Sequence, residues 1–77
     1  MNIKLYTTTD CPWCKKVEAY LNKKGVQFEK CNCTEHPEYK EELIAKSKQV
    51  GVPVLDIDGT IIIGFDRQAI DEKLGGN

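Results

Sequence analysis

Stretches in which apolar and polar residues alternate are separated along the chain by stretches with helical periodicity. Residues 3–6 and 26–31 alternate and contain many strand-forming residues, so we predict a β-strand at each. Residues 12–24 between them show helical spacing, and Pro12 suits the first helical turn. The apolar positions of this helix are Cys14, Val17 and Leu21, with Tyr20 beside them. A strand–helix–strand unit of this kind predicts two parallel strands and a right-handed crossover.

A second helix is predicted in the middle of the chain. It begins near Thr34 or Pro37 and ends before the breaking sequence Gly51-Val52-Pro53. Its predicted apolar side consists of Tyr39, Leu43, Ile44 and Val50. The helix therefore has an apolar side that can cover one face of a sheet.

The last part of the chain predicts a hairpin and a third helix. Strands at 54–57 and 60–63 flank Asp58-Gly59, a strong signal for a two-residue hairpin. A helix from about residue 66 to 74 follows, and residues 75–77 form a frayed tail. Its core-facing residues are Ala69, Ile70 and Leu74, with Phe65 leading in. The order β-α-β-α-β-β-α predicts an α/β fold in which three helices flank a four-stranded mixed sheet, as a single domain spanning residues 1–77.

Charge and hydropathy narrow the class of protein. The 77 residues include 11 Lys and Arg and 12 Asp and Glu, so the formal net charge is -1 and the basic surplus of a nucleic-acid binder is missing. The longest purely apolar run, Ile61-Ile62-Ile63, is far shorter than the about 20 residues of a membrane-spanning helix. The N-terminus lacks the apolar segment of an export signal. We therefore expect a cytoplasmic monomer that binds neither nucleic acid nor membranes.

Four cysteines become informative in that setting, because cytoplasmic disulfides are usually transient and catalytic. Two of them lie in Cys11-Pro12-Trp13-Cys14, between the first predicted strand and the first predicted helix. A helix N-terminus stabilises a thiolate, which makes Cys11 the candidate nucleophile with an exposed sulfur. Cys14 lies one turn further on, more deeply buried, and can resolve a mixed disulfide at Cys11.

Neighbouring residues support this chemistry. Pro12 stiffens the turn and removes an amide donor, and Trp13 offers an exposed apolar contact to a partner. Lys15 and Lys16 place positive charge near the candidate thiolate. A structural disulfide or half of a zinc site are the alternatives for such a pair, and its position after a strand in a β-α-β unit favours redox chemistry.

These motifs resemble the glutaredoxins, a family with the thioredoxin fold. The resemblance covers residues 3–74, nearly the whole chain. The motifs that carry it are Leu5-Tyr6-Thr7, Cys11-Pro12-Trp13-Cys14, Lys15-Lys16, Leu21, Gly51-Val52-Pro53-Val54, Asp58-Gly59 and Gly64-Phe65-Asp66. The resemblance implies a small thiol–disulfide oxidoreductase that reduces protein disulfides through Cys11 and Cys14. No bound organic cofactor is needed, because the electrons reside in the two sulfurs.

The resemblance also implies a binding surface around the two cysteines. In the family the proline that matches Pro53 has a cis peptide bond and faces the cysteines, and the backbone of Val52 would pair with a bound peptide or glutathione. Gly64, Phe65 and Asp66 match the stretch that grips the glutathione carboxylate. A disulfide-containing partner protein is therefore expected to dock over Trp13, Val52 and Pro53, and residues 64–66.

Departures from the pattern bear on the electron donor. Glutathione-using members usually have a lysine where this chain has Thr8, a threonine where it has Gly51, and Gly-Gly-x-Asp where it has Gly64-Phe65-Asp66. Residues 63–70 look more like the NrdH-redoxin type of short bacterial glutaredoxin-like protein. That similarity implies a flavin-dependent thioredoxin reductase as donor. A glutathione-dependent glutaredoxin and a glutathione-linked iron–sulfur carrier are the alternatives.

Cys31 and Cys33 lie outside the family pattern. They would share one face of the second strand if it extended that far, as two spare thiols or as a second redox or metal-binding pair. With Cys11 and Cys14 their spacing is close to that of a four-cysteine zinc ribbon, but the intervening segment has the pattern of a helix and a strand, so we expect no metal site. His36 is expected to be a solvated residue at a helix start.

Overall fold

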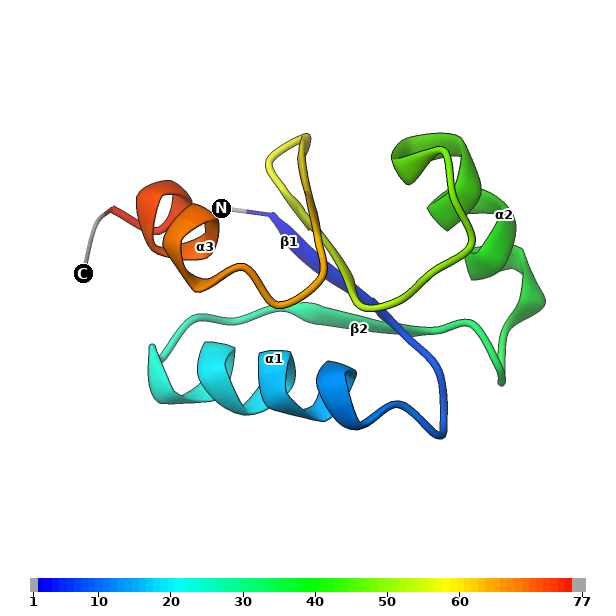
Figure 1. Cartoon of the computed structure of the whole chain (residues 1–77), viewed down its shortest axis with the longest axis horizontal. Helices are drawn as coiled ribbons and strands as arrows, with labels where there is room; N and C mark the ends of the chain where they lie inside the picture. The colour runs from blue at the N-terminus through cyan, green and yellow to red at the C-terminus, as the bar shows by residue number, and fades with distance from the viewer. Residues whose placement is uncertain (1, 76–77) are drawn as a thin grey trace.

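The computed structural model describes residues 2–75, so Gly76 and Asn77 of the predicted tail lie outside the described residues. The order of elements is the predicted β-α-β-α-β-β-α (Figure 1). They are β1 (Ile3–Thr7), α1 (Pro12–Lys23), β2 (Glu29–Asn32), α2 (Pro37–Ser47), β3 (Val54–Ile57), β4 (Thr60–Ile63) and α3 (Arg67–Lys73). No helix within residues 2–75 is long and apolar enough to cross a membrane.

The four strands form one mixed sheet in the order β2-β1-β3-β4. β1 pairs with β2 in parallel, and β3 is antiparallel to both β1 and β4. Asp58 and Gly59 join β3 to β4 with φ values of 50° and 92°, which a two-residue turn of the primed type requires. The predicted α/β fold with a four-stranded mixed sheet and three helices is confirmed.

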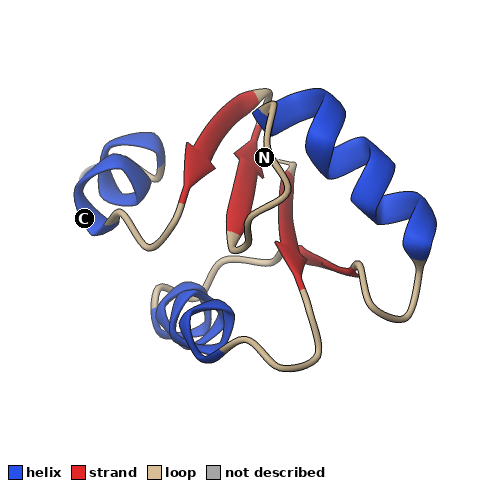
Figure 2. Ribbon diagram, turned by 45° about the vertical axis from the view of Figure 1, so that its right-hand side comes forward, coloured by secondary structure: helices blue, strands red, loops and turns tan. Residues whose placement is uncertain are grey.

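The two faces of the sheet carry separate cores. Figure 2 shows α1 and α3 on one side of the sheet and α2 on the other. The first core joins Ile3, Leu5, Val17, Leu21, Leu55, Ile57, Ile62 and Ile70 from β1, α1, β3, β4 and α3. The second joins Tyr6, Cys31, Leu43 and Val54 from β1, β2, α2 and β3. Alternation along β1 therefore sends odd-numbered residues toward α1 and even-numbered ones toward α2.

Several boundaries differ from the sequence prediction, three of them for a reason that the structure shows. β2 begins at Glu29 because Val26 donates its N–H to the Leu21 carbonyl across 3.4 Å, in the turn that closes α1. β1 continues through Thr7, one residue beyond the predicted strand at 3–6. α2 ends at Ser47, because Lys48 adopts a left-handed conformation that caps the helix.

The predicted apolar side of α2 is therefore only partly right. Leu43 is buried, but Val50 lies beyond the helix and is 59% exposed, and Ile44 is 38% exposed. The apolar side of α1 is as predicted, since Cys14, Val17 and Leu21 are its buried residues. In α3, Ile70 is buried, and Ala69 and Leu74 pack against the first core.

A polar network ties α2 to the sheet. The buried Tyr6 donates its hydroxyl hydrogen bond to Glu42, which also accepts one from Lys4 at 3.0 Å. Lys46 donates to the Tyr6 hydroxyl at 2.9 Å and forms an ion pair with Asp56 at 2.6 Å. Hydrogen bonds from Tyr6 and Lys4 lower the pKa of Glu42 from its ordinary 4.5 to about 2.

Because of this network, the free energy of unfolding is expected to depend on pH in the acid range. The pKa of Glu42 is lower in the folded than in the unfolded chain. The contribution of the ionised Glu42 to the free energy of unfolding is therefore complete above pH 4.5 and is lost as the pH falls toward 2. We expect Glu42→Gln to cost about 1 kcal/mol at pH 7, since a third of the side chain is exposed, and to flatten that acid dependence. Urea unfolding at several pH values measures both effects. Glu41→Gln, at an exposed neighbouring position, is the control and should change neither.

Candidate redox site

The β1–α1 junction brings the two predicted redox cysteines together. Cys11 is the N-cap of α1 with extended backbone, and Pro12 occupies the start of the helix, where its missing N–H costs no hydrogen bond. Cys11 and Cys14 form a disulfide, with Cα atoms 5.2 Å apart. The Cys11 sulfur also accepts the backbone N–H of Cys14 at 3.1 Å. The Cys11 sulfur therefore lies in the positive field at the start of the helix.

Both sulfur-bearing residues are buried, which corrects one expectation. Cys11 is 8% exposed and Cys14 is 2% exposed, so the predicted order is kept but Cys11 is not an exposed residue. The disulfide and the hydrogen bond from Cys14 hold the Cys11 sulfur against the first turn. Little of either cysteine is therefore accessible to solvent in the disulfide form.

Trp13 and Phe65 link the motif to the loop before α3. Trp13 is 57% exposed, and its ring lies 6.5 Å from that of Phe65. Phe65 in turn meets the ring of Tyr20 edge-on at 5.6 Å. The Lys16 ammonium lies 4.3 Å above the Trp13 ring, so this lysine lies against the aromatic surface. The side chain of Lys15 is exposed to solvent on the surface of α1.

The loop that leads into β3 meets the end of β4. The Val52–Pro53 peptide bond is cis, the geometry that the resemblance implies. Gly64 donates its N–H to the Pro53 carbonyl at 2.9 Å and has φ 78°, a conformation that favours glycine. Asp66 then caps α3, accepting the N–H of Ala69 at 3.1 Å. These contacts place Val52, Pro53 and Gly64 side by side, and Phe65 joins them to Trp13.

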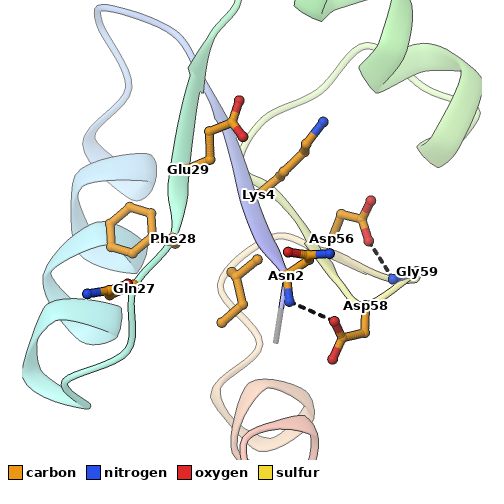
Figure 3. A pocket seen from close by; sticks show the side chains of 9 residues that line it. Asn2, Lys4, Gln27, Phe28, Glu29, Asp56, Asp58 and Gly59 are labelled. Atoms are coloured by element: carbon orange, nitrogen blue, oxygen red, sulfur yellow. Dashed lines mark hydrogen bonds between the residues drawn. The ribbon is translucent and has the colours of Figure 1, made fainter.

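A hollow of about 780 Å³ opens at the opposite end of β1 from Cys11 (Figure 3). Its lining consists of Asn2, Ile3, Lys4, Gln27, Phe28, Glu29, Asp56, Asp58 and Gly59, none of them a predicted site residue. Two of its hydrogen bonds fasten the β3–β4 turn, from the Asn2 N–H to Asp58 and from the Gly59 N–H to Asp56. The hollow is thus separate from the redox pair.

Comparison with known proteins agrees with this geometry. The family model for glutaredoxin matches residues 3–62. A glutaredoxin-like 8.6 kDa protein in the rubredoxin operon of Clostridium pasteurianum is 47% identical over 72 residues, which cover 94% of this chain and 96% of that protein. This chain belongs to the glutaredoxin family. It is a thiol–disulfide oxidoreductase with the thioredoxin fold.

The chain is also similar to two proteins of Escherichia coli, a glutaredoxin and a glutaredoxin-like protein. Glutaredoxin 3 of Escherichia coli K12 is 35% identical over 75 residues, which cover 97% of this chain and 90% of that protein. The structure of NrdH-redoxin from Escherichia coli, a glutaredoxin-like protein with a thioredoxin-like activity profile, aligns with a TM-score of 0.84 and 29% identity. The alignment covers 94% of this chain and 93% of the NrdH-redoxin chain.

The remaining cysteines of this glutaredoxin lie on the α2 side of the sheet. Cys31 is fully buried in the second core, and Cys33, one residue beyond β2, packs against that core. The Cys33 N–H donates to the Thr7 carbonyl at 2.8 Å, which continues the strand pairing by one residue and keeps both thiols on one face, as expected. Cys33 also lines a hollow of about 290 Å³ with Thr8, Thr34, Lys40, Leu43, Val50 and Val52.

The four cysteines do not converge on a metal ion. In residues 2–75 no group of three or more His, Cys, Asp or Glu side chains is arranged to hold one. Cys11 and Cys14 are bonded to each other at the start of α1, whereas Cys31 lies beneath α2. His36 is the exposed N-cap residue of α2, as predicted, and its ring meets Tyr39.

Burial should make the two spare thiols of the glutaredoxin unreactive. Burial, with Glu29 nearby, raises the pKa of Cys31 to about 11, and burial also raises the pKa of Cys33. We expect iodoacetamide at pH 7.5 to modify Cys33 slowly and Cys31 not at all in the oxidised, folded protein, because the thiolate is the nucleophile. Intact-mass and peptide mass spectrometry measure this. Both thiols should react in denaturant, and rapid modification of Cys31 in the folded protein would contradict the assignment.

Proposed function

We propose that this glutaredoxin reduces protein disulfides in two thiol–disulfide exchange steps. The Cys11 thiolate attacks a substrate disulfide, forming a mixed disulfide and releasing one substrate thiolate. Cys14 then attacks the Cys11 sulfur, which releases the second substrate thiolate and leaves the Cys11–Cys14 disulfide. The observation that supports these roles is the position of Cys11, whose sulfur at the start of α1 accepts the N–H of Cys14.

The substrate is proposed to dock on the surface around Cys11. Trp13 offers an exposed ring, and Val52 offers backbone groups beside the cis bond to Pro53 for pairing with an extended segment. Gly64 and the neighbouring Phe65 and Asp66 would flank that segment on the other side. Such a surface fits an extended peptide that carries its own cysteine, because main-chain pairing imposes few sequence requirements.

Replacing one cysteine at a time tests the two roles. The reduced Cys14→Ser protein should form a stable mixed disulfide with insulin, because its attacking thiol remains and the resolving thiol is gone. The reduced Cys11→Ser protein should form none and should not reduce insulin. Non-reducing electrophoresis and intact-mass measurement distinguish the two outcomes. Cys33→Ser, which removes a spare thiol, is the control and should turn over normally; a Cys11→Ser protein with full activity would refute the assignment.

We further propose that a flavin-dependent thioredoxin reductase reduces the Cys11–Cys14 disulfide. Thr8 and Gly51 stand where the glutathione-using members that the chain resembles usually have lysine and threonine. A lysine at position 8 would supply a charged hydrogen-bond donor for a glutathione carboxylate. The hydroxyl of Thr8 is an uncharged donor, which forms a weaker hydrogen bond with a carboxylate. The thioredoxin-like activity profile of NrdH-redoxin supports the same donor. Glutathione is the alternative reductant, favoured by the similarity to glutaredoxin 3.

NADPH-linked insulin reduction with two donor systems tests this proposal. One contains a bacterial thioredoxin reductase, and the other contains glutathione with glutathione reductase. We expect turnover with the first and a rate about tenfold lower with the second, the effect of one missing charge-assisted hydrogen bond. Thr8→Lys should raise the glutathione rate and leave the other unchanged. Equal or faster turnover with glutathione in the unmodified protein would refute the proposed donor while leaving the dithiol mechanism intact.

A further inference from the structure

β4 lies at one edge of the sheet, and that edge is apolar. In the sheet that residues 2–75 form, the order β2-β1-β3-β4 leaves β2 and β4 each with one unpaired side. β2 carries the exposed charged residues Glu29 and Lys30, which discourage another strand from pairing with it. The sequence of β4, Thr60-Ile61-Ile62-Ile63, has no charged residue, and Ile63 is 50% exposed. β4 therefore lacks the charges that commonly protect an edge strand.

The hairpin determines which backbone groups of β4 face outward. Thr60 directly follows the two-residue turn, so its N–H and C=O groups pair with β3. The direction of these groups alternates along a strand, so those of Ile62 also face β3, and the Gly64 N–H continues the alternation by donating to the carbonyl just before β3. The backbone groups of Ile61 and Ile63 therefore point away from the sheet, where an added strand can pair with them.

A groove of about 470 Å³ runs along this edge between β4 and α3. Its helical side is lined by the N-cap residue Asp66 and by Ala69, Glu72 and Lys73 of α3. These spacings of three, four and seven residues place the four side chains on one flank of the helix. Because the start of α3 follows closely on the end of β4, the helix runs back along the strand. Lys73 therefore lies beside Thr60, at the far end of the groove from Asp66.

We propose that the edge of β4 binds a second copy of this chain, β4 against β4 in antiparallel orientation about a two-fold axis. An axis through Ile62 places Ile61 of each copy opposite Ile63 of the other, and each such pair exchanges two backbone hydrogen bonds. The side chains of Ile61 and Ile63 lie on the same face of the sheet, because they are two residues apart. The exposed Ile63 then packs against Ile61 of the second copy.

The distribution of isoleucines selects this register. The outward backbone groups of Ile61 and Ile63 also allow axes through either of these two residues. An axis through Ile61 would place Ile63 against Gly59 in the turn of the second copy, and an axis through Ile63 would place Ile61 against Phe65. The axis through Ile62 pairs each outward-facing isoleucine with another isoleucine, so it removes the most apolar surface from water.

The charges along α3 are complementary about the same axis. The two α3 helices would lie antiparallel on one face of the joined sheet, so the start of each meets the end of the other. Asp66 of one copy then faces Lys73 of the second, and Arg67 faces Glu72; all four side chains are exposed. Opposite charges at each position favour this orientation. This self-complementarity favours a second copy over an unrelated extended segment as the occupant of the edge.

The interface is small, so the dimer should be weak. Two short strands and one flank of each α3 bury less than about 1,200 Å² in total, the range of transient complexes, and we expect a dissociation constant on the order of 100 µM. The chain would then be the monomer that the sequence predicts at micromolar concentration and largely a dimer at millimolar concentration. The dimer holds no intermolecular disulfide, because its interface contains no cysteine.

Sedimentation equilibrium and amide hydrogen exchange test the proposal. The unmodified protein should sediment as a monomer at about 10 µM and as a dimer in majority at about 1 mM. Exchange of the Ile61 and Ile63 amides should be about fivefold slower at the higher concentration, because only the monomer exposes them, whereas Ile62 exchange should not change. Non-reducing electrophoresis should show no covalent dimer. A chain that stays monomeric at the higher concentration, leaving the edge open to a segment of another protein, overturns the proposal.

Substitutions on the two sides of the groove locate the interface. Ile63→Lys places a charge between the strands and should leave only monomer at about 1 mM, whereas Val50→Lys, at an exposed apolar position outside the groove, should dimerise normally. Lys73→Glu sets like charges against Asp66 and should weaken the dimer about tenfold, whereas Lys23→Glu on α1 should not. A dimer that persists in both Ile63→Lys and Lys73→Glu uses another surface and overturns the proposal.

Discussion

The start of α1 is the constraint on which the chemistry of this protein depends. A thiolate is stabilised where unpaired backbone N–H groups converge, and the first turn of a helix is such a place. Cys11 occupies the N-cap, and Cys14, one turn later, contributes both the N–H that bonds the first sulfur and the second sulfur itself. The chain can place these atoms reproducibly because β1 is buried in the centre of the sheet, between β2 and β3.

The hairpin supplies the other wall of the site. β3 begins directly after the cis bond to Pro53, and β4 ends just before Gly64, so their antiparallel pairing brings two distant loops together at one end of the sheet. The hydrogen bond from Gly64 to Pro53 fixes the two loops to each other, and the contact of Phe65 with Trp13 fixes them to α1. A surface assembled in this way combines rigid backbone with one exposed aromatic ring, a combination suited to recognising many disulfides.

Local signals predicted most of this architecture, and long-range packing explains what they missed. The helix at 12–24, the Asp58-Gly59 turn and the cysteine pair each depend on a few neighbouring residues, and they were predicted from the sequence. Val50 continued a helical pattern, but the left-handed Lys48 ended the helix before it. Thr7 is polar, and the strand predicted from the sequence pattern ended before it, at residue 6. Only the parallel pairing with Asn32 and the burial beneath α1 extend the strand through it.

The sheet also separates two kinds of sulfur. Cys11 and Cys14 lie at the start of the helix that covers one face, and Cys31 and Cys33 lie on the other face against α2. Near α1 the helix field stabilises a thiolate, whereas burial beneath α2 raises the pKa of both spare thiols. Exchange among all four would divert the electrons, because a third thiolate could attack the mixed disulfide. The sheet therefore places the free Cys31 and Cys33 on the opposite face from the bonded Cys11 and Cys14.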